Sequence, residues 1–228
     1  MYKLFIHIPK NAGMTIRNSE VLRGKIVCAG RGAHVSEQYT QKLEETMRAS
    51  KDGNGYEHGR WRDVRKDLRD TYPAFAIIRN PWSRVVSRYY FAKKVIERVK
   101  TQPKDYADVS SFEAFLEERH KWGGKEFFWH RAVRGWYPTL DHVTDENGRV
   151  RVDCIRFEHL NEEIEKYFMI PKMSRARNVT FGTIPKPSYT DIYTPETIQI
   201  IADWYKDDID YWGFDFDKPA TRNYWDAR

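Results

Sequence analysis

The feature that most constrains the fold is an uninterrupted apolar run over residues 74–78, Ala-Phe-Ala-Ile-Ile, which lies between Tyr-Pro and Arg-Asn-Pro. A strand with one solvated face alternates apolar and polar residues, whereas this run is apolar at every position. It is therefore expected to be a strand covered on both faces, as in a parallel sheet. Residues 2–8 and 25–29 supply two further β-forming runs.

Helical patterns separate these runs. Asn80 and Pro81 provide an N-cap and a first-position proline for a long helix to about residue 100, and Ser36 caps a helix to about residue 49. Further helices are expected over residues 15–22, 61–70, 111–120, 158–167 and 195–206. The alternation predicts a single domain over residues 1–228, an α/β three-layer sandwich with a central parallel sheet.

The remaining segments are expected to be turns and loops. Asn147-Gly148 predicts a hairpin between strands at 140–143 and 150–156. Loops or linkers are expected at 50–59, 101–110, 122–138 and 175–193. Within the aromatic stretch, Trp129, Trp136 and Tyr137 could stack on a sugar ring or equally pack into the core.

Composition narrows the class of protein. With 228 residues, 40% of them apolar and 32% charged, the chain is not disordered, and no apolar run approaches the length of a membrane span. Because the first residues lack a basic leader and a cleavage site, we expect a cytoplasmic protein. Cys28 and Cys154 are predicted to be reduced core thiols, and no Cys/His spacing suggests zinc.

Residues 6–16, Ile-His-Ile-Pro-Lys-Asn-Ala-Gly-Met-Thr-Ile, have the pattern of a strand, a small-residue loop and a helix start. Backbone N–H groups in such a loop can converge on an anion, with Lys10 adding charge and Thr15 a hydroxyl donor. The lysine precedes the glycine, so the loop is not a Walker A motif. The alternative is an ordinary strand-to-helix turn with a surface lysine.

A second candidate anion site follows the strand at 74–78. Arg79 stands at its carboxyl end, where ligands bind in open α/β sheets. Ser87 lies two turns into the next helix, and both side chains could reach one phosphate, for which arginine offers a planar fork. Arg84 and Arg88 are interpreted as surface residues of an amphipathic helix.

These segments together resemble the PAPS-dependent sulfotransferases, which use 3′-phosphoadenosine 5′-phosphosulfate (PAPS). The likeness is to the carbohydrate-type and bacterial members, whose first loop reads Pro-Lys-x-Ala-Gly. The serine eight positions after Arg79 resembles the family's 3′-phosphate motif. Further similar segments lie at residues 32–36, 155–160, 189–193 and 202–210. The resemblance implies a P-loop-NTPase-like sulfotransferase fold.

The resemblance also implies a donor site. Lys10 and Thr15 would hold the 5′-phosphosulfate, and Arg79 and Ser87 the 3′-phosphate. The full set expected to bind PAPS, or its product adenosine 3′,5′-bisphosphate, is Lys10, Asn11, Ala12, Gly13, Met14, Thr15, Arg79 and Ser87. Met14 departs from the Thr or Ser that is usual in the family, which removes a side-chain donor but keeps the backbone N–H. No metal is expected to be required, because lysine and arginine supply the positive charge.

Sulfuryl transfer to a hydroxyl requires leaving-group neutralisation and a base. Lys10 is suited to the leaving oxygen, and His34, in the loop after the second strand, is the candidate base. His7 is expected to be a core residue, whereas His120, His130 and His142 stay open as alternative bases. The acceptor is expected to be a carbohydrate.

Two other functions compete with this interpretation. A P-loop-like kinase would use ATP, but the Walker A motif and a clear magnesium-binding carboxylate after a strand are missing. A non-enzymatic module for polyanions or nucleic acid would use positive charge, but the net charge of +6 is modest and spread along the chain. A sulfotransferase without a nucleic-acid partner is therefore favoured.

Overall fold

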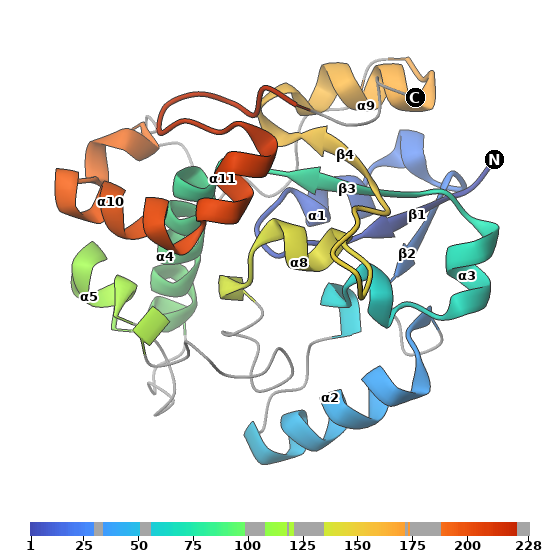
Figure 1. The fold of residues 1–228 in the computed structure, drawn as a ribbon, viewed down its shortest axis with the longest axis horizontal. Coiled ribbons are helices and arrows are strands. Elements are labelled where there is room, and N and C mark those ends of the chain that lie inside the picture. Colours follow the sequence, from blue (N-terminus) through green and yellow to red (C-terminus); the bar gives the residue numbers. More distant parts are fainter. Residues whose placement is uncertain are drawn as a thin grey trace.

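The computed structural model describes residues 1–29, 34–50, 56–98, 108–117, 119–120, 135–171, 173 and 188–222. Within these residues a four-stranded sheet has the order β2-β1-β3-β4, and all neighbouring strands are parallel (Figure 1). The strands are β1 (Lys3–Ile6), β2 (Ile26–Ala29), β3 (Ala74–Ile78) and β4 (Asp153–Arg156). The predicted α/β class with a parallel sheet is confirmed.

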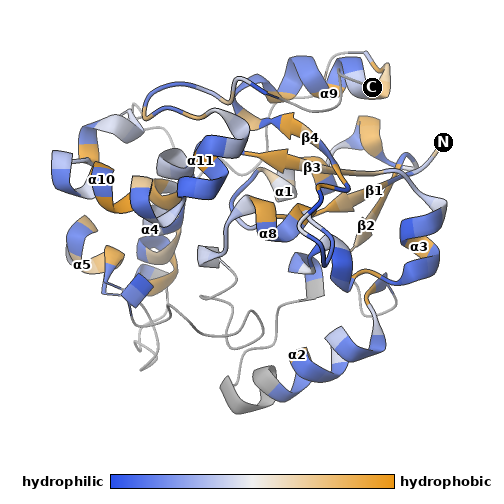
Figure 2. Ribbon diagram, viewed as in Figure 1, coloured by the Kyte–Doolittle hydropathy of each residue, from blue (hydrophilic) through white to orange (hydrophobic). Residues whose placement is uncertain are grey.

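Both faces of the sheet are covered by helices. Alternate residues of β3 belong to two separate apolar clusters, Ala74, Ala76 and Ile78 to one, and Phe75 and Ile77 to the other. The first cluster includes residues of α4 (Pro81–Arg98), α8 (Thr139–Val143), α10 (Pro195–Trp204) and α11 (Lys206–Trp212). The second includes residues of α1 (Gly13–Arg17) and α9 (Leu160–Phe168). Figure 2 shows the apolar strands between helices with largely hydrophilic outer faces.

The predicted helix starts at Ser36 and Asn80 are confirmed. The Tyr39 backbone N–H donates to Ser36 Oγ (3.2 Å) at the start of α2 (Glu37–Ser50). At the start of α4, the Ser83 N–H donates to Asn80 Oδ1 (3.2 Å). In each case a side-chain oxygen satisfies a backbone donor that the first turn of a helix leaves unpaired.

The predicted strand at residues 140–143 is wrong, because these residues form the helix α8. The Asp208 carboxylate, which lies on α11, accepts the backbone N–H groups of Thr139 (2.6 Å) and Leu140 (2.8 Å). This cap comes from a residue remote in the chain, so local pattern does not reveal it. The predicted turn itself holds, since Thr144 pairs antiparallel with Val150 and Gly148 has a φ of 75°.

Other helix boundaries differ from the sequence expectation. The range 15–22 divides into α1 and the 3-10 turn η1 (Glu20–Leu22), and the range 61–70 into η4 (Trp61–Asp63) and α3 (Lys66–Thr71). The helix predicted to end at 206 stops at Trp204, and α11 follows separately, because Tyr205 has a non-helical backbone (φ −110°) and its buried hydroxyl donates to Trp136 O (3.0 Å).

Short elements complete the described chain. They are η3 (Tyr56–His58), α5 (Phe112–Leu116), η5 (Phe157–His159) and η6 (Tyr189–Ile192). No helix of the described residues is long and apolar enough to cross a membrane. Most of the predicted loops at 101–110, 122–138 and 175–193 lies outside the described residues, as do Trp129 and His130.

Candidate active site

The two predicted anion-binding segments lie at one edge of the sheet. β1 and β3 are neighbouring parallel strands, so the loop after β1 and Arg79 after β3 leave the sheet side by side. The helices that follow them diverge, because α1 packs on one face of the sheet and α4 on the other (Figure 1). Ligands of open α/β sheets bind at such a switch point.

The loop after β1 has the backbone of an anion-binding nest. Lys10 and Ala12 adopt left-handed conformations, with φ of 67° and 57°. Left-handed residues are uncommon outside glycine, and their alternation with right-handed ones turns successive N–H groups toward one point. A Cβ on Gly13 would lie 1.7 Å from His7 Nε2, so this position requires glycine.

Buried contacts fix the loop to the strand beside it. Asn11 is 1% exposed, and its Nδ2 donates to Ile77 O (2.8 Å) in β3. Arg79 Nη1 donates to Lys10 O (2.9 Å), while its Nε and Nη2 donate to Ser83 Oγ (3.0 and 2.8 Å). The structure therefore brings Lys10 and Arg79 into contact. Ser87, which is buried, lies one helical turn beyond Ser83 on the same side of α4.

Arg84 is not the surface residue that the sequence predicts. It is 1% exposed, and its guanidinium donates to three backbone carbonyls, Pro9 O (3.1 Å), Tyr137 O (2.8 Å) and Gly135 O (3.3 Å). One of these belongs to the residue before Lys10. Arg84 thus supports the loop from within the protein. The sequence could not show this, because an arginine in an amphipathic helix pattern is normally expected on the exposed face.

The charge balance of the site favours an anion. Burial, followed by the positive charges of Arg79, Arg88 and Lys94, lowers the pKa of Lys10 to about 7. Burial also lowers the pKa of Arg79 to about 10, although the nearby Glu158 carboxylate opposes this. Since the strongest charges acting on Lys10 are all positive, an anionic group in this crevice would be attracted strongly.

His34 lies at the end of β2, the strand on the other side of β1. Its Nδ1 is 2.8 Å from Cys28 O. A carbonyl oxygen can only accept, so Nδ1 carries the proton, and the lone pair of the neutral ring is on Nε2. This is the tautomer that a general base requires.

The other histidines of the described residues differ in burial. His7 and His142 are 6% and 0% exposed, and burial holds the pKa of His7 well below its usual range. His120 is exposed beside Arg119. His58, which the sequence did not single out, has its Nδ1 3.0 Å from His7 O and its ring edge-on to that of His7. It is the last residue of η3, in a polar stretch that the sequence predicts as a loop and that has no pattern to mark the histidine.

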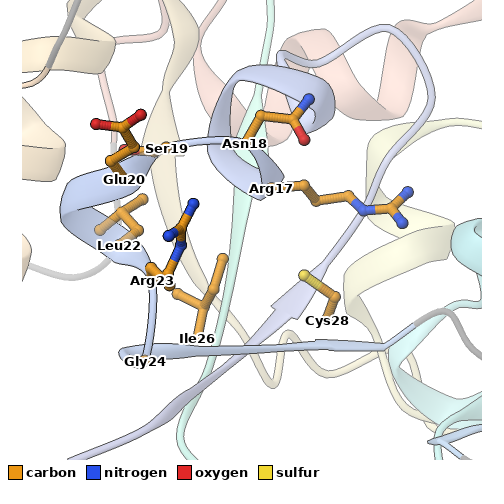
Figure 3. A pocket seen from close by; sticks show the side chains of 9 residues that line it. All are labelled: Arg17, Asn18, Ser19, Glu20, Leu22, Arg23, Gly24, Ile26 and Cys28. Atoms are coloured by element: carbon orange, nitrogen blue, oxygen red, sulfur yellow. The ribbon is translucent and has the colours of Figure 1, made fainter.

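A cavity of about 400 Å³ lies between α1, η1 and β2 (Figure 3). Its lining residues are Arg17, Asn18, Ser19, Glu20, Leu22, Arg23, Gly24, Ile26 and Cys28. The thiol of Cys28 points toward Arg17 (Figure 3), and the Cys28 carbonyl holds His34. Cys28 is only partly buried and is not the core thiol that the sequence predicts, whereas Cys154 is a core thiol as predicted, and the two do not form a disulfide.

Burial decides the role of one of the candidate aromatic residues. Trp136 is 3% exposed and belongs to the core, so it is not available to stack on a sugar. Within the described ranges, no group of three or more histidine, cysteine, aspartate or glutamate side chains is placed to hold a metal ion.

Comparison with known families agrees with this geometry. The family model described as "Sulfotransferase family" matches residues 3–215, which run from β1 past the end of α11. No curated protein and no solved structure is significantly similar to the chain. The match covers most of the chain and includes both segments that flank the crevice. The chain therefore belongs to the sulfotransferase family and is a PAPS-dependent enzyme.

Proposed function

We propose that the enzyme transfers the sulfuryl group of PAPS to a hydroxyl of a carbohydrate, with the donor bound across the crevice between β1 and β3. The observation that carries this proposal is the contact between Arg79 and the Lys10 carbonyl (2.9 Å), which joins the two predicted anion sites at one point. PAPS has anionic groups at its 3′ and 5′ positions, and the crevice offers a cationic side chain for each.

The residues fit such a donor. Arg79, which follows β3, and Ser87, one helical turn beyond the Ser83 that Arg79 contacts, would bind the 3′-phosphate. The nest of residues 10–15 would bind the 5′-phosphosulfate through the backbone N–H groups of Ala12 and Gly13 and through the Thr15 hydroxyl. The backbone N–H groups of Asn11 and Thr15 donate to Ile8 O (3.3 Å) and Ala12 O (2.9 Å), so Asn11 would act by holding the loop in place. The Met14 side chain is 43% exposed and contributes no donor, so only its backbone N–H would take part.

Lys10 and His34 would share the chemistry. The acceptor oxygen attacks the sulfur in line, and the bond between the sulfur and the bridging phosphate oxygen breaks. Lys10 would neutralise the charge that develops on that oxygen. His34 Nε2 would take the proton of the acceptor hydroxyl, and the hydrogen bond that Nδ1 donates to Cys28 O would orient the ring.

A carbohydrate acceptor is supported by the lining of the cavity beside β2. The cavity beside β2 shares Cys28 with the His34 contact, and its lining includes the polar side chains Arg17, Asn18 and Arg23. Such a lining offers hydrogen-bond donors to a hydrophilic molecule. A screen of sugar and phenolic acceptors with radiolabelled PAPS would identify the class, and turnover of phenols alone would exclude a carbohydrate acceptor.

The roles of Lys10 and His34 are tested by substitution with acceptors of different acidity. His34→Ala is expected to lose about 10²- to 10⁴-fold in turnover with an alcohol acceptor, the usual contribution of a general base. A nitrophenol acceptor, which needs less help in losing its proton, should restore part of that loss. Lys10→Ala should stay impaired with both acceptors, because the leaving group is unchanged.

His58→Ala is the matched control, since His58 makes the same Nδ1–carbonyl contact one strand away. Near-normal turnover of His34→Ala on an alcohol, with a large loss in His58→Ala, would transfer the role of base to His58. If both variants keep normal turnover, His120, His130 or Glu37 becomes the next candidate.

A further inference from the structure

Phe91 is an aromatic side chain at the donor crevice that the proposed mechanism does not use. It is 50% exposed, and it lies on α4 one turn beyond Ser87. The Lys10 ammonium lies 3.9 Å from the centre of its ring. This separation is well within the range of a cation–π interaction.

The other groups that face Lys10 are cationic or titratable. They are Arg79 after β3, Arg88 and Lys94 on α4, and His7 at the end of β1, whose own pKa Lys10 helps to lower. The three cations repel the ammonium, whereas the face of the Phe91 ring attracts it. The ring therefore favours the charged form of Lys10 where its neighbours oppose that form.

We propose that Phe91 is a positioning residue whose ring holds the Lys10 ammonium in the donor-free enzyme and releases it when the phosphate groups of the donor bind. This inference rests on the role proposed above for Lys10. The release follows from relative strength, because a contact between an ammonium and a phosphate is a charge-assisted hydrogen bond, stronger than a cation–π contact at a half-exposed ring.

A definite dependence on pH follows from this release. The ring stabilises only the free enzyme with Lys10 charged, so it should weaken ligand binding where Lys10 is charged. Where Lys10 is neutral before binding, the ring should have no effect. If the ammonium instead stayed on the ring in the complex, removal of the ring would leave binding at low pH unchanged and weaken it at high pH.

The experiment compares Phe91→Leu with the wild-type enzyme by calorimetry, with adenosine 3′,5′-bisphosphate as the probe at about pH 6 and pH 9, on either side of the pKa of Lys10. The ratio of the two Kd values at each pH cancels the titration of the ligand itself. Phe91→Leu is expected to bind about two- to fivefold more tightly at pH 6, which corresponds to a cation–π contact of moderate strength. At pH 9 the ratio should be one.

Two controls separate the ring from other effects. Phe91→Tyr keeps a ring and should match the wild type at both pH values. In a Lys10→Met background, Phe91→Leu should change the Kd at neither pH, since the ammonium is absent. The role of Phe91 would be overturned by any of three results. These are equal Kd values of Phe91→Leu and wild type at pH 6, weaker binding by Phe91→Leu at pH 9, or the same gain in affinity in the Lys10→Met background. Failure of the wild-type enzyme to bind the probe at all would remove the proposed donor site together with this inference.

Discussion

Lys10 is held in surroundings that oppose its charge. Its backbone is in a left-handed conformation, and burial of its side chain, followed by the positive charges of Arg79, Arg88 and Lys94, lowers its pKa to about 7. A lysine in an unfolded chain keeps its ordinary pKa, so below pH 7 the folded protein bears the full unfavourable interaction. As pH rises from 7 toward 10.5, the folded state loses the proton before the unfolded state does, and the unfavourable contribution disappears.

Replacement of Lys10 by methionine is therefore expected to separate stability from function. Lys10→Met should raise the free energy of unfolding at pH 6 by up to about 5 kcal/mol, since each pKa unit corresponds to about 1.4 kcal/mol. The gain should shrink toward pH 10, while turnover is lost at every pH. Denaturant unfolding at several pH values measures this, and a Lys10→Met variant less stable than the wild type at pH 6 would contradict the electrostatic argument.

Arg79 and Ser87 are expected to differ in their effects, although the sequence assigns both to the 3′-phosphate. Ser87→Ala should reduce the preference for adenosine 3′,5′-bisphosphate over 5′-AMP, because only the 3′-phosphate contact is lost. Arg79→Ala should weaken the binding of both ligands, because Arg79 also holds the Lys10 carbonyl (2.9 Å). Calorimetric affinities for the two nucleotides decide this. If both variants keep the wild-type ratio of the two affinities, neither residue contacts the 3′-phosphate.

At the scale of the element, one side of the helix α4 packs into the core and another side contributes residues to the candidate donor site. Val85 and Val86 belong to the apolar cluster on one face of the sheet, and Arg84 is fully buried. Ser83, Ser87 and Phe91 recur every four residues and lie on one side of the helix. The hydroxyl of Ser83 holds Arg79, and the ring of Phe91 contacts Lys10. The helix therefore positions the site as well as covering the sheet.

Arg84 tests this dual role. Arg84→Met should lower the free energy of unfolding by about 3 kcal/mol or more, because three buried carbonyls lose their donor. Affinity for adenosine 3′,5′-bisphosphate should fall as well, since Pro9 O in the donor loop is one of the three. Arg65→Met is the matched control, because Arg65 is exposed and forms an ion pair with Asp67 at the surface, where ion pairs contribute little. Equal stability of the two variants would contradict a structural role for Arg84.

At the scale of the whole molecule, strand order creates the site. β2 lies outside β1, and β3 lies on the other side of β1, so the chain crosses the sheet between β2 and β3. This crossing puts α1 and α4 on opposite faces and brings Arg79 to Lys10, 69 positions earlier in the chain. The result is an excess of positive charge at this edge of the sheet, and this charge should respond to ligand binding.

Binding of adenosine 3′,5′-bisphosphate is expected to be coupled to proton uptake. Lys10 is mostly neutral at pH 8 in the free enzyme because its pKa is about 7, and a phosphate beside it should raise that pKa. Nearly one proton should be taken up at pH 8, and affinity should fall as pH rises above 7. Calorimetry in buffers of different ionisation enthalpy measures the uptake. Lys10→Met should show none, and absence of uptake in the wild type would mean that the phosphate does not bind beside Lys10.

Several features of the fold and of the site could be predicted from local sequence. The apolar run of β3 required burial on both faces, and Ser36 and Asn80 marked helix starts, because these signals depend on neighbouring residues alone. The order of the loop, Pro-Lys-Asn-Ala-Gly, and the spacing of Arg79 and Ser87 indicated two anion sites on one sheet edge. Their functional roles stay predictions until the variants are measured.

Tertiary structure decided the rest, because it depends on partners far apart in the chain. The helix α8 forms where a strand was predicted, since Asp208 caps it from α11. Arg84 is buried rather than exposed, since carbonyls of two separate loops meet at its guanidinium. The lowered pKa of Lys10 has the same origin. Its largest cause is burial in the folded chain, and the cations that add to it come from the end of β3 and from α4. The sequence by itself determined the residue types and the local turns, whereas only the packing of the sheet determined which charges face one another.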